Sequence, residues 1–145
     1  MSSYNQVGET RTLAETLGLA TAEIMALYDE MSDLCATIAA QFPDTYESIG
    51  KYQQAYHAVG ALSGACVTLE EPLDRIDPPL RRQAVTVTVG KQMRSNRSSS
   101  QRVRLGNAVV RLVGARDALM GEDLAADLAE IIEELGNVSF PQRYG

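Results

Sequence analysis

The feature that most constrains this fold is a run of apolar residues with heptad spacing in the first third of the chain. Intervals of four and three residues alternate along Leu13, Leu17, Ala20, Ile24, Leu27, Met31, Leu34 and Ile38. This spacing puts about one apolar side chain per turn on a single face of an α-helix, as in a coiled coil. We therefore predict one helix over residues 10–41. We expect the larger residues of this heptad seam to form an oligomer interface: Leu13, Leu17, Ile24, Leu27, Met31, Leu34 and Ile38.

A second helix is expected over residues 45–70. Pro43 disfavours helical geometry in the residue before it, and Asp44 and Glu47 have the spacing of a capping box. Because the connection is short, the two helices should form an antiparallel hairpin. Small residues fill the stretch 58–65 and predict the close approach of another backbone. The face predicted to lie inside carries Ile49, Tyr52, Tyr56, Val59, Leu62, Cys66 and Leu69.

The hairpin keeps the two cysteines apart. With the centre of the hairpin near residue 43, Cys66 faces the region of Ala20 rather than Cys35. The offset between the cysteines is about 22 Å along the helix, which is too far for a disulfide. We therefore interpret both as small apolar core residues.

The middle of the chain fits two structures. Three prolines in residues 70–79 predict a break after the second helix. Residues 85–89 then alternate Val and Thr, a pattern typical of a strand. Because apolar residues of 80–87 also share one helical face, we favour a helix that ends at about residue 94. The alternative is a β-hairpin that pairs residues 85–89 with 101–105 across a serine-rich loop.

Two further helices are predicted in the C-terminal third. The first has Leu105, Val109, Leu112 and Leu119 on its inner face and ends at Gly121. The second covers residues 122–135, and Gly136 with Asn137 ends it. Its inner face carries Leu124, Leu128, Ile131 and Leu135, and acidic residues occupy its outer face.

These elements define the expected fold class. We predict an all-α protein, a helical bundle of four to five helices built on a long antiparallel helical hairpin, with the short β-hairpin at 85–105 as the alternative for that segment. The helical domain should span residues 10–136, between an N-terminal arm of residues 1–9 and a C-terminal arm of residues 137–145.

The net charge of −6 is divided into blocks of opposite sign. Residues 91–116 hold seven of the thirteen basic residues and no acid, whereas residues 1–50 and 117–145 carry net charges of −7 and −6. Arginines around a serine-rich turn that opens a helix suit phosphate groups. The candidate anion-binding residues are Arg94, Arg97, Ser98, Ser99, Arg102 and Arg104. We favour the other interpretation, in which this basic segment pairs with the acidic blocks of the same chain or a neighbouring copy.

A helix-turn-helix is a second nucleic-acid hypothesis. Residues 10–29 have small, Gly and β-branched residues at the spacing of that motif. The heptad seam runs unbroken through the turn that the motif requires. The would-be recognition helix carries acids and no base, which is unfavourable next to DNA phosphates. We therefore favour one long helix.

No catalytic, metal or cofactor motif is present in the sequence, so we expect neither enzymatic activity nor a cofactor. His57 is the single histidine, and the hairpin puts it opposite Asp29 and Glu30. Such a pair can act as a general base or as half of a metal site. Because no further ligand or nucleophile is evident, we interpret His57 as a surface or interface residue.

The resulting hypothesis is a non-enzymatic binding or assembly protein, a subunit of a homo-oligomer or of a larger particle such as a virion or phage. A nucleic-acid or phosphate-ligand binder that uses the segment 91–116 is the alternative. No apolar run approaches the ~18 residues that span a bilayer, and the N-terminus lacks the pattern of a secretory signal. We therefore expect a cytoplasmic protein or a virion component with no membrane partner.

Overall fold

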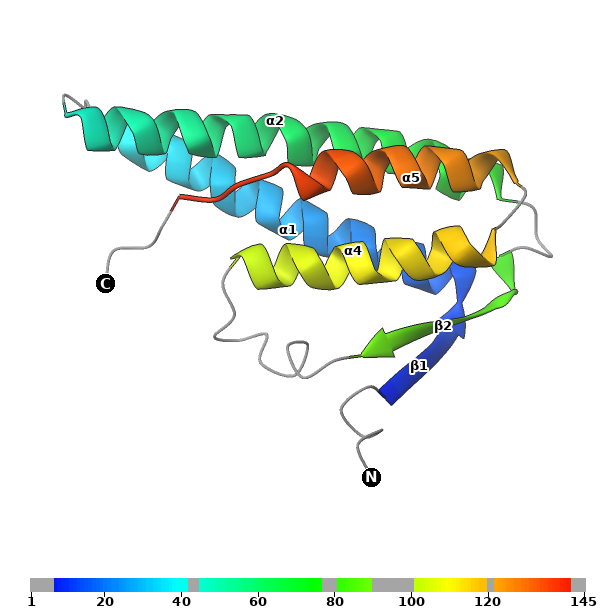
Figure 1. Cartoon of the computed structure of the whole chain (residues 1–145). Coiled ribbons are helices and arrows are strands. Elements are labelled where there is room, and N and C mark those ends of the chain that lie inside the picture. Colours follow the sequence, from blue (N-terminus) through cyan, green and yellow to red (C-terminus); the bar gives the residue numbers. More distant parts are fainter. Residues whose placement is uncertain (1–6, 42–44, 77–80, 90–100, 120–121, 142–145) are drawn as a thin grey trace.

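The computed structural model describes residues 7–41, 45–76, 81–89, 101–119 and 122–141, and confirms the expected fold class. In these ranges the elements are β1 (Val7–Thr12), α1 (Leu13–Ala40), α2 (Tyr46–Arg75), β2 (Ala84–Val89), α4 (Gln101–Ala118) and α5 (Asp123–Gly136). The helices pack side by side, with α1 and α2 as a long antiparallel hairpin and the two strands at one end of the bundle (Figure 1).

The first helix, α1, begins at Leu13, three residues later than predicted, because the preceding residues form β1. Thr12 caps it: the Glu15 N–H donates to Thr12 Oγ1 at 3.1 Å, and the Thr12 N–H donates to Glu15 Oε1 at 3.2 Å. The helix continues through Gly18 to Ala40 as a single element. A helix-turn-helix over residues 10–29 is therefore wrong, because the required turn is absent from α1.

The heptad seam lies inside the chain. Leu13, Leu17, Ala20, Ile24 and Leu27 are fully buried and belong to the core that α1 shares with α2 and α4. At the other end of α1, Met31 and Ile38 are also buried, and Leu34 is half-buried. Leu13, Leu17, Ile24 and Leu27 are therefore core residues and offer no surface to a second copy, because other helices of the same chain cover them. For Met31, Leu34 and Ile38 the oligomer interface stays a prediction.

The second helix, α2, is longer than predicted. The Ser48 N–H donates to Thr45 Oγ1 at 3.0 Å at its start, while the predicted cap Asp44 lies outside the described residues. The helix continues through Pro72 to Arg75, so the break predicted for residues 70–79 begins later than expected. Residues 77–79 lie outside the described residues. Leu69 and Ile76 are both buried, and this burial holds the last turns of α2 against the core.

The segment favoured as a helix over 78–94 contains the strand β2, and the strand interpretation is confirmed. Its partner is β1, in an antiparallel pair that aligns Thr10 with Thr86, whereas residues 101–105 belong to α4. The alternation of Val and Thr explains this outcome, because Val85 and Val87 are buried and Thr86 is exposed.

The last two helices agree with the sequence. In α4, Leu105 and Leu112 are buried, as is Leu119 just beyond it; the predicted stop at Gly121 lies outside the described residues. All four residues predicted for the inner face of α5 are buried, and Asn137 caps its end. Beyond α5, Val138 and Phe140 pack against the core.

Candidate interaction surface

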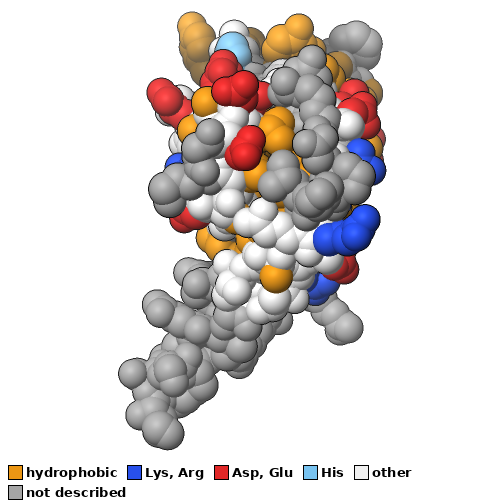
Figure 2. All heavy atoms as spheres, turned by 90° about the vertical axis from the view of Figure 1, so that its right-hand side faces the viewer, with side chains coloured by type: hydrophobic (Ala, Val, Ile, Leu, Met, Phe, Trp, Pro, Cys, Tyr) orange, Lys and Arg blue, Asp and Glu red, His pale blue; other side chains and the backbone are white. Residues whose placement is uncertain are grey.

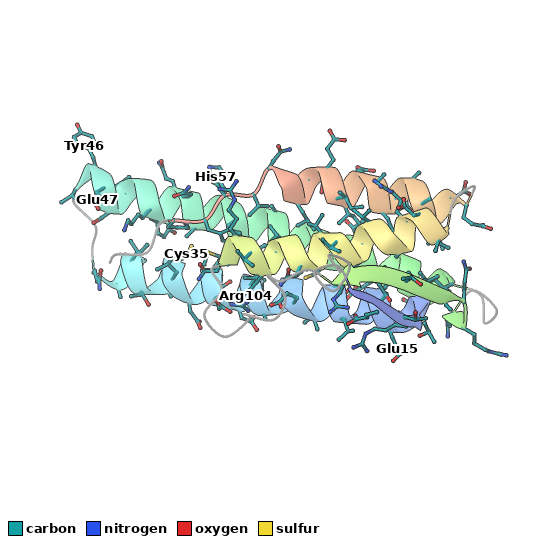
Figure 3. The ribbon with its side chains drawn as sticks, turned by 60° about the horizontal axis from the view of Figure 1, so that its bottom comes forward. Glu15, Cys35, Tyr46, Glu47, His57 and Arg104 are labelled. Carbon is teal, nitrogen blue, oxygen red and sulfur yellow. The ribbon has the colours of Figure 1, made fainter. Side chains whose placement is uncertain are left out.

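The outer face of α2 is the apolar surface that stands out in the described part of the molecule. We define it by residues three or four positions apart, which share one side of a helix: Tyr46, Ile49, Gln53, Tyr56, Gly60, Gly64 and Val67. Tyr46 is 97% exposed, Ile49 41%, Tyr56 62% and Val67 63%. Figure 3 shows Tyr46 at the end of α2, pointing away from the bundle.

This outer face carries no formal charge. From Tyr46 to Val67 the charged residues of α2 are Glu47 and Lys51. At 100° per residue, both point to the other side of the helix, away from Gly60. The uncharged face is therefore about 32 Å long at 1.5 Å per residue.

Two contacts between aromatic rings hold Tyr56 in place on this face. Its ring stacks on Tyr52, with centroids 6.1 Å apart and planes at 27°. His57 lies edge-on to Tyr56 at 6.4 Å. An aromatic side chain fixed by its neighbours loses little conformational freedom when a partner covers it, which favours binding.

The two glycines of this face leave its middle hollow. Apart from the adjacent backbone of α2, a Cβ atom built on Gly60 or Gly64 meets no atom of the described residues within 4 Å. The close approach predicted for the small residues of α2 therefore does not occur at these glycines. It is the alanines that face the core, since Ala55, Ala58 and Ala65 are buried.

The sequence pattern misassigned two residues of this surface. Ile49 and Tyr56 were expected inside, but the buried stripe of α2 consists of Ala55, Ala58, Leu62, Ala65 and Leu69. A signal for the outer face is present in the sequence, because its positions from Tyr46 to Gly60 follow heptad spacing. Gly and Gln do not count as apolar, so this second pattern is easily overlooked.

The basic segment pairs with acidic residues of the same chain. Arg104, on α4, reaches two carboxylates of α1: its Nη2 lies 3.0 Å from Glu23 Oε2 and its Nη1 lies 2.5 Å from Glu30 Oε2. Burial acts to lower the pKa of Arg104, but its bonds to Glu30 and Glu23 outweigh that effect and raise it. These contacts support the interpretation that opposite charge blocks meet within one molecule.

A second arginine of the segment joins α4 to β1. Arg111 Nη1 lies 2.5 Å from Glu9 Oε1, and Arg11 Nε lies 2.8 Å from the same oxygen. Burial tends to raise the pKa of Glu9, but the bonds from Arg11 and Arg111 prevail and lower it. The carboxylate of Glu9 therefore stays charged and ties the small sheet to the bundle.

Few of the candidate anion-binding residues can be placed. Arg94, Arg97, Ser98 and Ser99 lie outside the described residues. Arg102 is exposed near the start of α4, whereas the guanidinium of Arg104 is engaged by α1. The described part of the chain thus does not bring these residues together, and the anion site stays a prediction.

Charge is unevenly distributed over the end of the bundle where α1 begins. Figure 2 shows that acidic side chains gather mainly in the upper part of this end, while most of the visible Lys and Arg side chains lie along one side. Apolar atoms reach the surface between them.

The residues considered for catalysis do not form a site within the described ranges. His57 is exposed and contacts Tyr56, and no bond joins it to Asp29 or Glu30 there; Glu30 instead binds Arg104. The same ranges contain no group of three or more His, Cys, Asp or Glu side chains that could hold a metal ion. None of the described helices is long and apolar enough to cross a membrane.

Both cysteines are free and half-buried, and they pack against the core as expected. Burial raises the pKa of the Cys35 thiol. Burial and the nearby carboxylates of Glu70 and Asp29 raise the pKa of the Cys66 thiol. Neither environment favours the thiolate that a nucleophilic cysteine needs.

A cavity of about 620 Å³ lies at the end of the bundle where α1 finishes. The last residues of the heptad seam form much of its apolar lining, and polar side chains surround them. His57 and the cysteines do not line it. The lining consists of Glu30, Met31, Asp33, Leu34, Thr37, Ile38, Gln41, Ser48, Lys51, Gln101 and Pro141.

Comparison with known proteins yields no relative, since no family model, no curated protein and no solved structure matches this chain.

Proposed function

We propose that this protein is a non-enzymatic assembly protein, a subunit of a homo-oligomer or larger particle, which associates through the outer face of α2. The exposure of Tyr46, Ile49, Tyr56 and Val67 along one uncharged face carries the proposal. Apolar surface gathered in this way is unfavourable in water and typically marks a protein–protein contact.

The charge of the remaining surface supports a partner of the same kind. Exposed acids Glu130, Glu133 and Glu134 lie on α5, and Arg102 is exposed on α4. Pairing one of these charged surfaces with the outer face of α2 leaves charges without compensation, which is costly. A second copy presents the same uncharged stretch, so the parts of the two faces that overlap bury each other without that cost.

Light scattering during size-exclusion chromatography tests the proposal. We expect the wild-type protein to be an oligomer and the double variant Tyr56→Glu, Val67→Glu to be a monomer, because two carboxylates on each copy must otherwise be buried. The matched control is Met25→Glu on α1, whose side chain is 52% exposed and lies outside the α2 face.

The control variant should remain an oligomer of wild-type size. Circular dichroism should show the same helix content for all three proteins, because each substituted side chain is exposed. A wild-type protein that is monomeric up to its solubility limit, or a double variant that assembles as well as the wild type, contradicts the proposal.

A further inference from the structure

We infer that the partner is a second copy whose α2 packs antiparallel to the first, with the two-fold axis at Gly60 and each Tyr56 ring over Gly64 of the other copy. This inference rests on the proposed function and adds the orientation and the register of the contact. Three properties of the outer face of α2 carry it: the order of large and small residues, the open space at the glycines and the position of the charges.

The first property is an uneven distribution of side-chain size. Large side chains occupy the first half of the face, from Tyr46 to Tyr56, and small ones occupy the second half, from Gly60 to Val67. Parallel helices would set large residues against large ones and glycine against glycine, leaving a void at one end. Antiparallel helices set the large half of one copy against the small half of the other, which allows the close packing that protein interfaces need.

The open space at the glycines selects the register. With Gly60 on the axis, residues whose numbers add up to 120 face each other. Tyr56 then lies over Gly64 of the other copy, and Gln53 lies beside Val67 of the other copy. Outside the nearby backbone of α2 itself, no atom of the described residues lies within 4 Å of a Cβ built on Gly60 or Gly64, so the space there is open to a ring from outside.

The charges near the end of α2 favour the same orientation. Glu70 and Asp74 are exposed there. A parallel pair would bring both acids next to their equivalents, which is repulsive. The antiparallel register overlaps the uncharged stretches of the two copies from Gln53 to Val67. It sets Glu70 beside Gly50 and Asp74 beside Tyr46 of the other copy, where the exposed phenol can donate a hydrogen bond. Opposed helix dipoles also favour antiparallel packing.

Disulfide cross-linking tests the orientation directly. Cys35→Ala and Cys66→Ala provide a background without native thiols, and Gln53→Cys and Val67→Cys are added singly and together. Within one chain these two positions are about 21 Å apart along α2, so an intramolecular disulfide cannot form. After mild oxidation at a concentration where the protein is assembled, we expect a cross-linked dimer from the double variant and none from either single variant.

The outcomes separate this inference from the proposed function. Cross-links in both single variants indicate parallel helices, and a cross-link in one of them alone indicates an antiparallel pair centred on that residue. Either result overturns the inference, while self-association through α2 stands. An oligomer that gives no cross-link in any variant also overturns it. If the wild-type protein and the cysteine-free background are both monomeric by light scattering, the proposed function itself fails.

A second variant tests whether the hollow at Gly64 is filled. Gly64→Leu should weaken the dimer by about tenfold or more, because a side chain there occupies the space of Tyr56 from the other copy. The matched control is Gly18→Leu on α1, another helical glycine at which an added Cβ meets no atom of the described residues within 4 Å beyond the adjacent helix backbone. Both variants should keep the wild-type helix content, and an unchanged dissociation constant for Gly64→Leu overturns the inference.

Discussion

Thr16 is an exception in the core of α1. Its side chain is fully buried, and its hydroxyl has no hydrogen-bond partner in the described chain. A buried hydroxyl that has given up its bonds to water without replacement costs folding free energy. The rest of the α1 core face is apolar, so a methyl group fits this environment better than a hydroxyl does.

We expect Thr16→Val to raise the free energy of unfolding by about 1 kcal/mol, because Val has nearly the same shape and no group to leave unpaired. Thr21→Val is the control, since the Thr21 hydroxyl donates to the Leu17 carbonyl at 2.8 Å and its loss should give no gain. Urea unfolding of both variants measures the difference. A destabilised Thr16→Val protein would show that the hydroxyl has a role.

Glu9 should make stability depend on pH on the acid side. Burial acts to raise the pKa of Glu9, but the bonds from Arg11 and Arg111 outweigh burial and lower this pKa from its ordinary value of 4.5. A lowered folded-state pKa means that the stabilisation is fully present above the unfolded-state value. It is lost as the pH falls through the folded-state value, because the unfolded chain then binds the proton more readily.

We therefore expect Glu9→Gln to lower the free energy of unfolding by about 1 kcal/mol at neutral pH. The difference from the wild type should shrink as the pH falls below 4.5, the ordinary value of this carboxyl group. Denaturant unfolding at a series of pH values measures this difference in the free energy of unfolding. A difference between the two proteins that stays constant down to about pH 3 contradicts the role of the Glu9 carboxylate.

At the scale of elements, α4 approaches β2 most closely at Gly114. A Cβ atom built there lies 3.0 Å from Val87 Cγ2, which is tighter than ordinary van der Waals contact. At Gly106, about two turns away on the same helix, an added Cβ meets no atom of the described residues within 4 Å apart from the adjacent helix backbone. The two glycines of α4 therefore have different reasons to be small.

We expect Gly114→Leu to lower the free energy of unfolding by about 1–3 kcal/mol, because the new side chain must displace Val87 or shift β2. Gly106→Leu is the matched change and should raise it by up to about 1 kcal/mol through better helix propensity. Thermal unfolding followed by circular dichroism measures both. Equal effects of the two substitutions would argue against close packing of α4 on β2.

At the scale of the whole molecule, the charge blocks and the apolar α2 face make opposite predictions about salt. If the basic segment bound acidic blocks of a neighbouring copy, assembly would weaken as salt screens the charges. Arg104 and Arg111 are already paired within the chain, and the outer face of α2 is uncharged from Tyr46 to Val67. Assembly should then depend on apolar burial, which salt does not screen.

We therefore expect the dissociation constant of the oligomer to stay the same or decrease when the ionic strength rises from about 0.05 M to 1 M, a range over which the screening length falls below 4 Å. Sedimentation velocity at the two salt concentrations measures it. Dissociation at high salt would instead favour contacts between charge blocks of neighbouring copies.

The sequence determined the helices, because the signals for a helix are local. Heptad spacing specified α1, and the 3.6-residue period of Leu124, Leu128, Ile131 and Leu135 specified α5. The Val–Thr alternation also contained the signal for β2, although a helical pattern overlapped it. Each of these patterns reflects side-chain positions along one element, which are set by its own geometry.

Only the tertiary structure decided what each element packs against. The first part of the heptad seam, from Leu13 to Leu27, could have faced a second copy, but α2 and α4 cover it. β2 could have paired with residues 101–105, but it pairs with β1, far away in sequence. The same holds for the outer face of α2, which became an exposed surface because the alanines on the other side entered the core. Local spacing shows that a face is apolar, whereas burial depends on long-range packing, and that packing is absent from any short stretch of sequence.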